Sequence, residues 1–203
     1  RRKTSRESQD ANGLDTIYQS ATRDDPMNWP EFIHTDRLVL RRPTERDATA
    51  IFEGYAQDAD VVRYLMWRPH RSIDDTREFL RYLEDAWGTG TERTWALTFP
   101  EEDRVIGMIA IRPAGHKSDL GYVIGRKYWG QGLTTEAGRA IIDLAFSDPA
   151  VYRVWAVCDV ENHASARVLE KIGMTREGVL RRWIVHPNVS DQPRDSFCYA
   201  RIR

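Results

Sequence analysis

The sequence predicts a single α/β domain built on a mixed β-sheet. Two observations lead to this prediction. Several short runs rich in β-branched and aromatic residues indicate strands, and helical segments with one apolar face stand between them, including one strand–helix–strand succession. The chain has 203 residues and a hydrophobic content of 41%, which is enough to bury one sizeable core, so one domain accounts for its length.

Charge and hydropathy narrow the classes of partner. Thirty basic and 31 acidic residues leave a net charge of -1, so the chain lacks the broad positive field of non-specific nucleic-acid binding, and we expect no nucleic-acid partner. No apolar run approaches the roughly 18 residues that span a bilayer, so we expect no membrane partner. The charged start of the chain is unlike a signal peptide, which predicts a cytoplasmic location.

The N-terminal half is predicted to be mainly helical. Residues 1–30 are polar and show no sustained helix or strand period, so we interpret them as an N-terminal extension of a domain at residues 31–203. Arg37 to Arg41 alternates charged and apolar residues, as a half-buried strand does. Helices are expected at Thr44–Gln57, at Asp60–Leu65, and from Ser72 as N-cap to Trp87, before Gly88 and Gly90.

The C-terminal half is predicted to hold most of the sheet. Thr94–Phe99 and Arg104–Arg112 are joined by a polar connector of hairpin length, which indicates two antiparallel strands. The remaining strands are expected at Leu120–Ile124, Val151–Val157, about Thr175–Val185 and Ser196–Ile202, and the remaining helices at Thr134–Phe146 and Ser165–Ile172. The first two of these strands and the helix between them form a βαβ unit, so they should be parallel with a right-handed crossover.

The segment from Gly125 to Ala137, inside that unit, carries the strongest chemical signal. Gly130 and Gly132 let the backbone turn and approach a ligand closely, and the following helix presents free N–H groups and a positive dipole end. A pyrophosphate fits such a site. The segment lacks the Gly-Lys-Ser/Thr ending of a P-loop and the third glycine of a dinucleotide fingerprint. A plain glycine turn before a helix is the simpler interpretation.

A second polar segment, Asn162 to Gly173, directly follows the next strand. Asn162 and Ser165 bring an amide and a hydroxyl to the cleft outside the carboxyl ends of the parallel strands, where ligands of open α/β sheets bind. The simpler interpretation makes each of them a helix cap.

Taken in order, these segments resemble the GCN5-related N-acetyltransferase (GNAT) family, in its Rim-type (RimJ/RimL-like) branch, which is similar to ribosomal-protein N-terminal acetyltransferases. The resemblance spans about Phe32 to Ile202 and includes the stretches Thr35–Arg41, Trp67–His70 and Leu120–Ile124 beside the two segments above. It implies a GNAT fold with a central mixed, mostly antiparallel, splayed sheet of about seven strands, flanked by four or so helices.

The resemblance also implies acetyl-CoA as acyl donor and an amine as acceptor. The family's pyrophosphate pattern, Gln/Arg-x-x-Gly-x-Gly/Ala, is occupied here by Lys127, Gly130 and Gly132, and lysine keeps the positive charge of the first position. The pantetheine arm would pair with the strand near Tyr122 like an added strand. The cofactor-binding residues implied are Tyr122, Val123, Ile124, Lys127, Trp129, Gly130, Gln131, Gly132, Leu133, Thr134 and Asn162.

Two residues are candidates for catalysis. Ser165 matches the serine that is proposed in this branch to protonate the leaving thiolate, and Asp119 matches an acidic position that many members carry on the strand before the glycine loop. An amine is mostly protonated near neutral pH, so a carboxylate would have to remove its proton directly or through water. A backbone N–H of the strand at Tyr122–Ile124 would stabilise the oxyanion. Glu136, in the first turn of a helix, is interpreted as a dipole partner.

The acceptor is left open by the sequence. Trp67, Arg68 and His70 are candidates for the acceptor site, and the acceptor is either the N-terminal α-amine of a protein or a small amine such as a polyamine, an aminoglycoside or an amino acid. A non-catalytic acyl-CoA sensor and a scaffold domain are further alternatives. The five histidines lack metal-ligand spacing, so we expect no metal, and Cys158 is interpreted as a buried thiol. A homodimer is possible by analogy with similar proteins.

Overall fold

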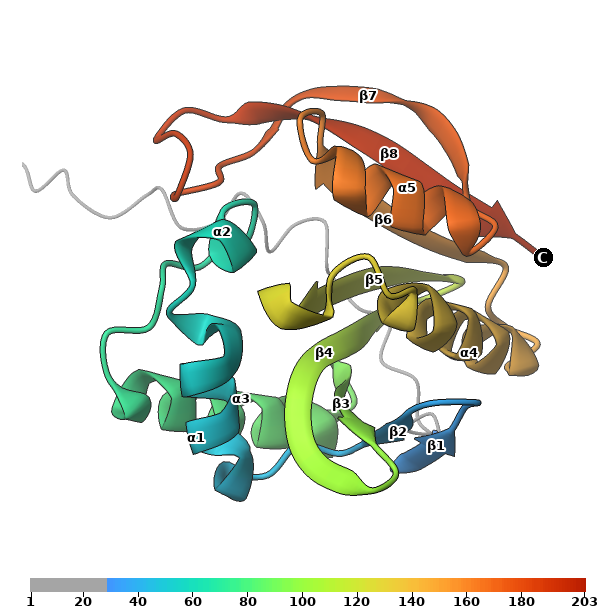
Figure 1. Cartoon of the computed structure of the whole chain (residues 1–203). Helices are drawn as coiled ribbons and strands as arrows, with labels where there is room; N and C mark the ends of the chain where they lie inside the picture. Colours follow the sequence, from blue (N-terminus) through green and yellow to red (C-terminus); the bar gives the residue numbers. More distant parts are fainter. Residues whose placement is uncertain (1–28) are drawn as a thin grey trace, which may run out of the picture.

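Residues 29–203 are described by a computed structural model of the chain, in which one sheet of eight strands runs through the domain (Figure 1). Its strand order is β1-β2-β3-β4-β5-β6-β8-β7. The strands are β1 Phe32–His34, β2 Val39–Arg41, β3 Arg93–Phe99, β4 Glu102–Ala114, β5 Lys117–Ile124, β6 Arg153–Asp159, β7 Thr175–Ile184 and β8 Arg194–Ile202. The α-helices are α1 Ala48–Ile51, α2 Ala59–Val62, α3 Ile73–Thr89, α4 Leu133–Ser147 and α5 His163–Lys171.

The sheet is splayed between β5 and β6. These two strands are parallel and pair over only three residues each, Lys117–Asp119 with Arg153–Trp155, whereas the other neighbouring strands of the described domain pair antiparallel. Beyond that seam β5 continues to Ile124 and β6 continues to Asp159 without pairing to each other. The predicted mostly antiparallel, splayed sheet is therefore confirmed.

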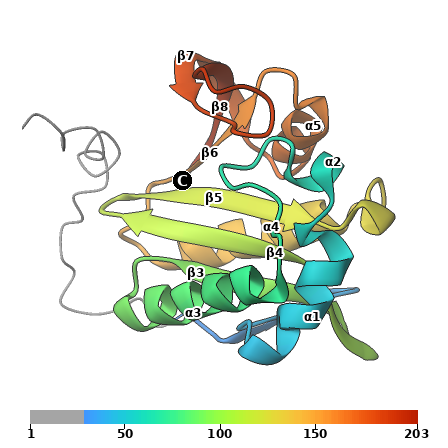
Figure 2. The same ribbon diagram turned by 90° about the vertical axis from the view of Figure 1, so that its left-hand side faces the viewer.

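Helices cover the sheet on both faces (Figure 2). α4 and α5 lie on one face, where Leu133, Ile141 and Leu169 join the larger buried cluster of the sheet. α1 and α3 lie on the other face, where Ile51 and Leu83 belong to a second cluster. The two clusters meet the strands on alternate residues, because successive side chains of a strand point to opposite faces. Each residue of β5 can thus be assigned to one face.

The prediction of one continuous α-helix at Thr44–Gln57 is wrong. Thr44–Gln57 comprises a 3-10 turn at Glu45–Asp47, the one-turn helix α1, and a π turn at Phe52–Ala56. Asp47 closes a capping box by accepting the backbone N–H of Thr44 at 2.8 Å, which fixes the tight first turn. The wider π turn accompanies the burial of both Tyr55 and Ala56 in the core.

Other boundaries differ from the sequence-based expectation by a few residues. The sheet has an eighth strand, β1, which is too short to show a period in the sequence but pairs antiparallel with β2 through a turn at Thr35–Arg37. β6 begins two residues later than expected, because Val151 donates its N–H to Asp148 in a turn. α2 is shorter than predicted and starts after Asp58, whose side chain accepts from the N–H groups of Asp60 and Val61. Most of the predicted N-terminal extension, residues 1–28, lies outside the described residues.

Candidate active site

The edge of β5 that faces the splay carries free backbone groups. Gly125 donates its N–H to Ile106 across β4 at 2.9 Å, and the register pairs Val123 with Met108. Backbone groups of an antiparallel strand point alternately to its two neighbours, so those of Tyr122 and Ile124 point away from β4 and into the splay. The indole Nε1 of Trp129 donates to the Ile124 carbonyl at 2.9 Å. The open edge is therefore shaped to accept an added strand-like ligand.

The glycine loop continues directly from this edge. After Gly125 the chain makes a 3-10 turn at Arg126–Tyr128 and then passes through Gly130 and Gly132, which have φ values of 76° and 78°. Gly132 is the N-cap of α4, so the first N–H groups of that 15-residue helix point out of the loop. A Cβ at Gly130 would meet no atom within 4 Å, so open space lies in front of the loop. The loop and helix start can hold a pyrophosphate anion.

Three hydrogen bonds from the turn between β1 and β2 hold Glu136 in the first turn of α4, and a fourth holds the glycine loop. The Glu136 carboxylate accepts the Thr35 hydroxyl at 2.6 Å and the Arg37 backbone N–H at 2.7 Å. Arg37 Nε donates to Glu136 Oε2 at 2.7 Å, and Arg37 Nη1 donates to the Gln131 carbonyl at 3.0 Å. Sequence reasoning missed this connection because its partners lie about a hundred positions apart. The adjacent polar residues of Thr35–Arg37 were its only sequence signal.

Ser165 lies next to Tyr122. Its Oγ is 2.7 Å from the Tyr122 hydroxyl, which is also 3.2 Å from the Ser165 carbonyl oxygen. Burial raises the pKa of the Tyr122 phenol well above its ordinary value, so the group stays protonated. Asn162 Oδ1 accepts the Ser165 N–H at 3.1 Å, so Asn162 is the N-cap of α5. Its contact with a cofactor stays a prediction. Cys158 lies nearby, and burial raises the pKa of its thiol to about 11.

Asp119 lies on the opposite face of β5 from Tyr122. Its Oδ2 accepts from Arg112 Nη1 at 2.9 Å, and the Arg112 Nε donates to Glu92 Oε2 at 2.8 Å. The buried carboxylate of Glu92 and the partly buried carboxylate of Asp119 thus share one guanidinium. Burial raises the pKa of Asp119 above its ordinary value, and the bond to Arg112 opposes this rise only in part. Arg112 and Glu92 were not predicted, although Arg112 ends the apolar run of its strand.

The three acceptor-site candidates separate into two groups. The rings of Trp67 and His70 lie 5.0 Å apart and both contact Phe79 of α3. His70 Nδ1 is 2.7 Å from the Thr76 hydroxyl, and burial lowers the pKa of the imidazole, which favours its neutral form. Arg68 instead turns to the β7–β8 loop, where its Nη1 donates to the Pro187 carbonyl at 3.0 Å.

The β7–β8 loop carries a buried polar group that the sequence did not reveal. His186 is 3% exposed, and neither ring nitrogen has a hydrogen-bond partner among residues 29–203. Its Nε2 lies 3.7 Å from Asp159 Oδ2 at the end of β6, and its ring meets Tyr64 edge-on. Asn188 in the same loop donates to the carbonyls of Val62 and Trp67 at 2.8 and 2.7 Å. The loop therefore links the end of β6 to the segment around α2.

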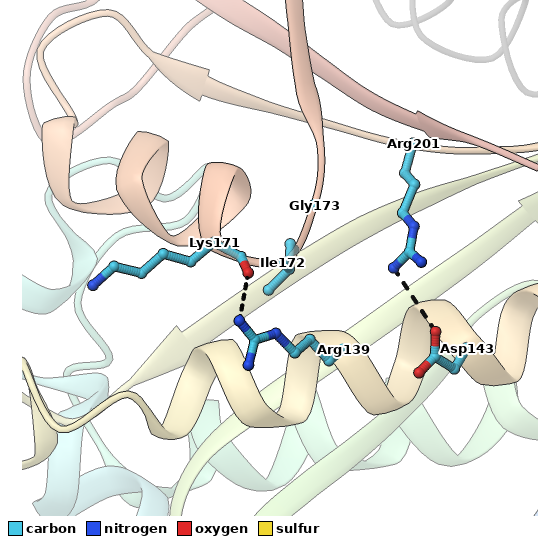
Figure 3. A pocket seen from close by; sticks show the side chains of 6 residues that line it. All are labelled: Arg139, Asp143, Lys171, Ile172, Gly173 and Arg201. Atoms are coloured by element: carbon cyan, nitrogen blue, oxygen red, sulfur yellow. Dashed lines mark hydrogen bonds and ion pairs between the residues drawn. The ribbon is translucent and has the colours of Figure 1, made fainter.

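An open groove of about 480 Å³ lies between α4, α5 and β8 (Figure 3). Its lining comprises Arg139, Asp143, Lys171, Ile172, Gly173 and Arg201. Arg139 donates to the Lys171 carbonyl at 2.9 Å, at the C-terminal end of α5. None of the site residues expected from the sequence lines this groove, so it is separate from the splay and the glycine loop.

Residues 29–203 show neither a metal cluster nor a membrane-spanning helix. In that part of the chain, His, Cys, Asp and Glu side chains do not gather in any group of three that could hold a metal ion. Across the same residues, every helix is too short or too polar to cross a bilayer.

Comparison with known proteins identifies the fold and family. The family model described as "Acetyltransferase (GNAT) domain" matches residues 37–175. A GNAT-family acetyltransferase of Bacillus anthracis, solved by crystallography, is 31% identical, with a TM-score of 0.73 over 84% of this chain and 98% of its own. The range 37–175 that the family model matches includes β5, the glycine loop, α4 and α5.

Relatives identified by sequence similarity are also N-acetyltransferases. The uncharacterized N-acetyltransferase p20 of Bacillus licheniformis is 29% identical over 154 residues, covering 74% of this chain and 86% of the relative. The [ribosomal protein uS5]-alanine N-acetyltransferase of Escherichia coli strain K12 is 28% identical over 162 residues, covering 74% and 81%. The expected GNAT resemblance, with Rim-type enzymes among the relatives, is thus confirmed. The chain belongs to the GNAT family and is an acetyl-CoA-dependent acetyltransferase.

Proposed function

We propose that this enzyme moves the acetyl group of acetyl-CoA directly to a primary amine, and that its acceptor is the N-terminal α-amine of a protein. The observation that carries the proposal is the Tyr122–Ser165 hydroxyl pair, 2.7 Å apart, beside the free edge of β5. Hydroxyls at that position can serve a thiolate that leaves inside the splay. The similarity to a ribosomal-protein alanine N-acetyltransferase supports the choice of a protein amine.

In this proposal the residues around the splay divide the work of binding. The pyrophosphate lies on the loop at Lys127–Thr134, where Gly130 and Gly132 leave the backbone N–H groups accessible. The pantetheine arm pairs with the backbone groups of Tyr122 and Ile124 that face the splay, as an added strand does. Because the Trp129 indole donates to the Ile124 carbonyl, the indole must turn aside for a ligand amide to take that position.

The proposed reaction uses both faces of β5. Asp119, on the α3 face, takes a proton from the acceptor ammonium directly or through a water, and the neutral nitrogen attacks the thioester carbonyl carbon. A backbone N–H of β5 stabilises the oxyanion of the tetrahedral intermediate. When the carbon–sulfur bond breaks, the CoA thiolate takes a proton from the Ser165–Tyr122 hydroxyl pair on the other face. The former amine nitrogen releases its second proton to solvent, and a water returns a proton to the hydroxyl pair. The products are an amide and free CoA thiol.

The testing experiment measures thiol release from acetyl-CoA with a panel of acceptors, while calorimetry measures CoA binding in parallel. The panel contains N-terminal peptides, polyamines, aminoglycosides and amino acids. Turnover with peptides alone is the expected result. Turnover with one small-molecule class alone would replace the protein amine by that class and keep the acyl donor. CoA binding without turnover of any amine would refute the proposed transfer.

A further inference from the structure

The turn between β1 and β2 is fastened to the first turn of α4. The carboxylate of Glu136 receives three hydrogen bonds from this turn, at 2.6 Å from the Thr35 hydroxyl, 2.7 Å from the Arg37 backbone N–H and 2.7 Å from Arg37 Nε. The Glu136 side chain is 16% exposed, so solvent weakens these bonds less than at an open surface. This cluster, here called the Arg37–Glu136 clamp, joins residues that are 99 positions apart.

The clamp also holds the glycine loop itself. Arg37 Nη1 donates to the carbonyl of Gln131 at 3.0 Å, and Arg37 Nη2 lies 3.6 Å from the place of a Cβ on Gly132. Gln131 stands between two glycines in left-handed conformation, Gly130 and Gly132. Glycines lose more conformational freedom on ordering than any other residue, so a loop of this kind costs entropy to hold in one shape. The guanidinium holds the Gln131 carbonyl, which lies between the two glycines.

The charge of Glu136 gives the clamp a second effect. A carboxylate in the first turn of a helix stabilises the helix, but it also repels an anion that binds at the same helix end. Arg37 sets a guanidinium directly against this carboxylate, and the hydrogen bonds from Thr35 and Arg37 lower the pKa of Glu136 despite its partial burial. The carboxylate is therefore negatively charged, and the positive charge of Arg37 offsets its repulsion of an anion. The helix start keeps its capacity to receive a phosphate.

We propose that Arg37, anchored by Glu136, is a positioning residue that holds the Gly130–Gly132 loop in the shape that receives the pyrophosphate of acetyl-CoA. The inference rests on the proposed use of this loop for the acyl donor. A loop already held in its bound shape pays less entropy when the ligand arrives, so the clamp acts on affinity. Arg37 takes no part in the chemical step, because its contacts lie with the loop and α4.

The first test compares the effects of the variants on KM for acetyl-CoA and on kcat. Arg37→Ala is expected to raise KM for acetyl-CoA about three- to tenfold, the size expected when binding must order a segment that is no longer held in place, with kcat nearly unchanged. Arg37→Lys keeps the charge but cannot donate to Glu136 and Gln131 together, so it should restore only part of the affinity. Glu136→Gln keeps an acceptor oxygen and should fall between wild type and Glu136→Ala.

The matched control is Arg77→Ala. Arg77 on α3 forms exposed ion pairs with Asp74 and Glu45 rather than with the loop, so this variant also loses one arginine and its surface pairs. It should keep the wild-type KM. If Arg37→Ala does not fold, Glu136→Gln, which retains volume and hydrogen-bonding oxygen, carries the same comparison.

Amide hydrogen exchange supplies a readout that does not depend on CoA. In the full-length protein without ligand, the amides of Gly130 to Leu133 should exchange several-fold faster in Arg37→Ala than in wild type, while α3 amides should not change. Unchanged exchange and unchanged KM in folded variants would overturn the inference. Faster exchange in a protein that fails to bind CoA even as wild type would instead refute the proposed function and leave the clamp intact as a loop restraint.

Discussion

Tyr122 and Asp119 stand on the same strand, three residues apart, yet they serve opposite faces of the sheet. The Tyr122 hydroxyl meets Ser165 of α5 at 2.7 Å, whereas the Asp119 carboxylate meets Arg112 at 2.9 Å on the side of α3. In the proposed reaction, the proton acceptor for the amine and the proton donor for the thiolate therefore approach from opposite faces of β5 and do not compete for one position.

Removing the hydroxyl pair should slow the chemical step. We expect Ser165→Ala and Tyr122→Phe each to lower kcat about tenfold or more, with KM for acetyl-CoA little changed, because a general acid acts in the transition state. Steady-state kinetics with the preferred acceptor makes the measurement. Ser147→Ala is the control, since its hydroxyl donates to the Leu144 carbonyl at the far end of α4. Wild-type kcat in Ser165→Ala would leave Ser165 with a structural role alone.

The pH dependence should report on Asp119. Burial raises the pKa of this carboxyl above its ordinary value. As pH falls, Asp119 therefore becomes protonated, and loses its ability to act as a base, at a higher pH than an exposed aspartate does. We expect kcat/KM to decline on the acid side at a pH above the ordinary carboxyl range of about 4. Asp119→Asn should lower kcat/KM and remove that acid limb. A profile that keeps the same limb in Asp119→Asn would assign it to another group.

Gly132 should tolerate no side chain with a branched Cβ. Its φ of 78° is strained for such a residue, and the backbone at this N-cap has to approach a phosphate. Gly132→Val is expected to weaken CoA binding about tenfold or more, measured by calorimetry, with a smaller effect on thermal unfolding. Gly178→Val on β7 is the control, because a Cβ there meets no atom within 4 Å and φ is not positive. Equal CoA affinity in folded Gly132→Val would remove the loop from the cofactor site.

The buried carboxylate at the end of β6 should matter for stability. Asp159 is fully buried, and Arg194 donates to it at 2.6 and 3.1 Å. Burial alone would raise the pKa of Asp159, but the bonds from Arg194 and the bond from the Glu161 backbone N–H together outweigh it and leave the pKa below its ordinary value. A lowered folded-state pKa contributes stability above the unfolded value, and this stability is lost as pH falls through the folded value.

Arg194→Met is therefore expected to destabilise the fold by about 3 kcal/mol at neutral pH, since it leaves a buried charge unpaired. Urea denaturation makes the measurement, and the loss should shrink as pH falls, because without Arg194 burial raises the pKa of Asp159 and the variant protonates this carboxylate at a higher pH than wild type does. The control is Arg153→Met, whose partner Glu177 is 41% exposed, so its removal should cost about 0–1 kcal/mol. An equal loss of unfolding free energy in both variants would mean that the burial of Asp159 adds nothing to the contribution of its ion pair.

The sequence predicts the elements of the fold well where the apolar period is long, as in α4 and β4. It fails where local contacts override the period, as at Asp47, whose capping box shortens the first helix turn. It also misses β1, because three residues are too few to show alternation. The splay came from family resemblance, since no local pattern marks where two strands part.

Predicting the site required two kinds of information. The glycine loop and Asn162 cap are local, so the sequence could place them on a strand–helix junction. The partners of Asp119, Ser165 and Glu136 come from distant segments. Such contacts between charged or hydroxyl side chains produce no regular spacing of residues that the sequence could reveal. The Arg37–Glu136 clamp and the Arg112 network were invisible for this reason.

The short seam between β5 and β6 divides the sheet into two half-sheets, one formed by β1 to β5 and the other by β6, β8 and β7. Few backbone bonds cross that seam, so the two halves are weakly coupled through the sheet. A ligand that lines the splay touches both halves at once. Part of its binding free energy then becomes coupling energy between them, and occupancy by the acyl donor should make the N-terminal and C-terminal halves of the domain unfold as a single cooperative unit.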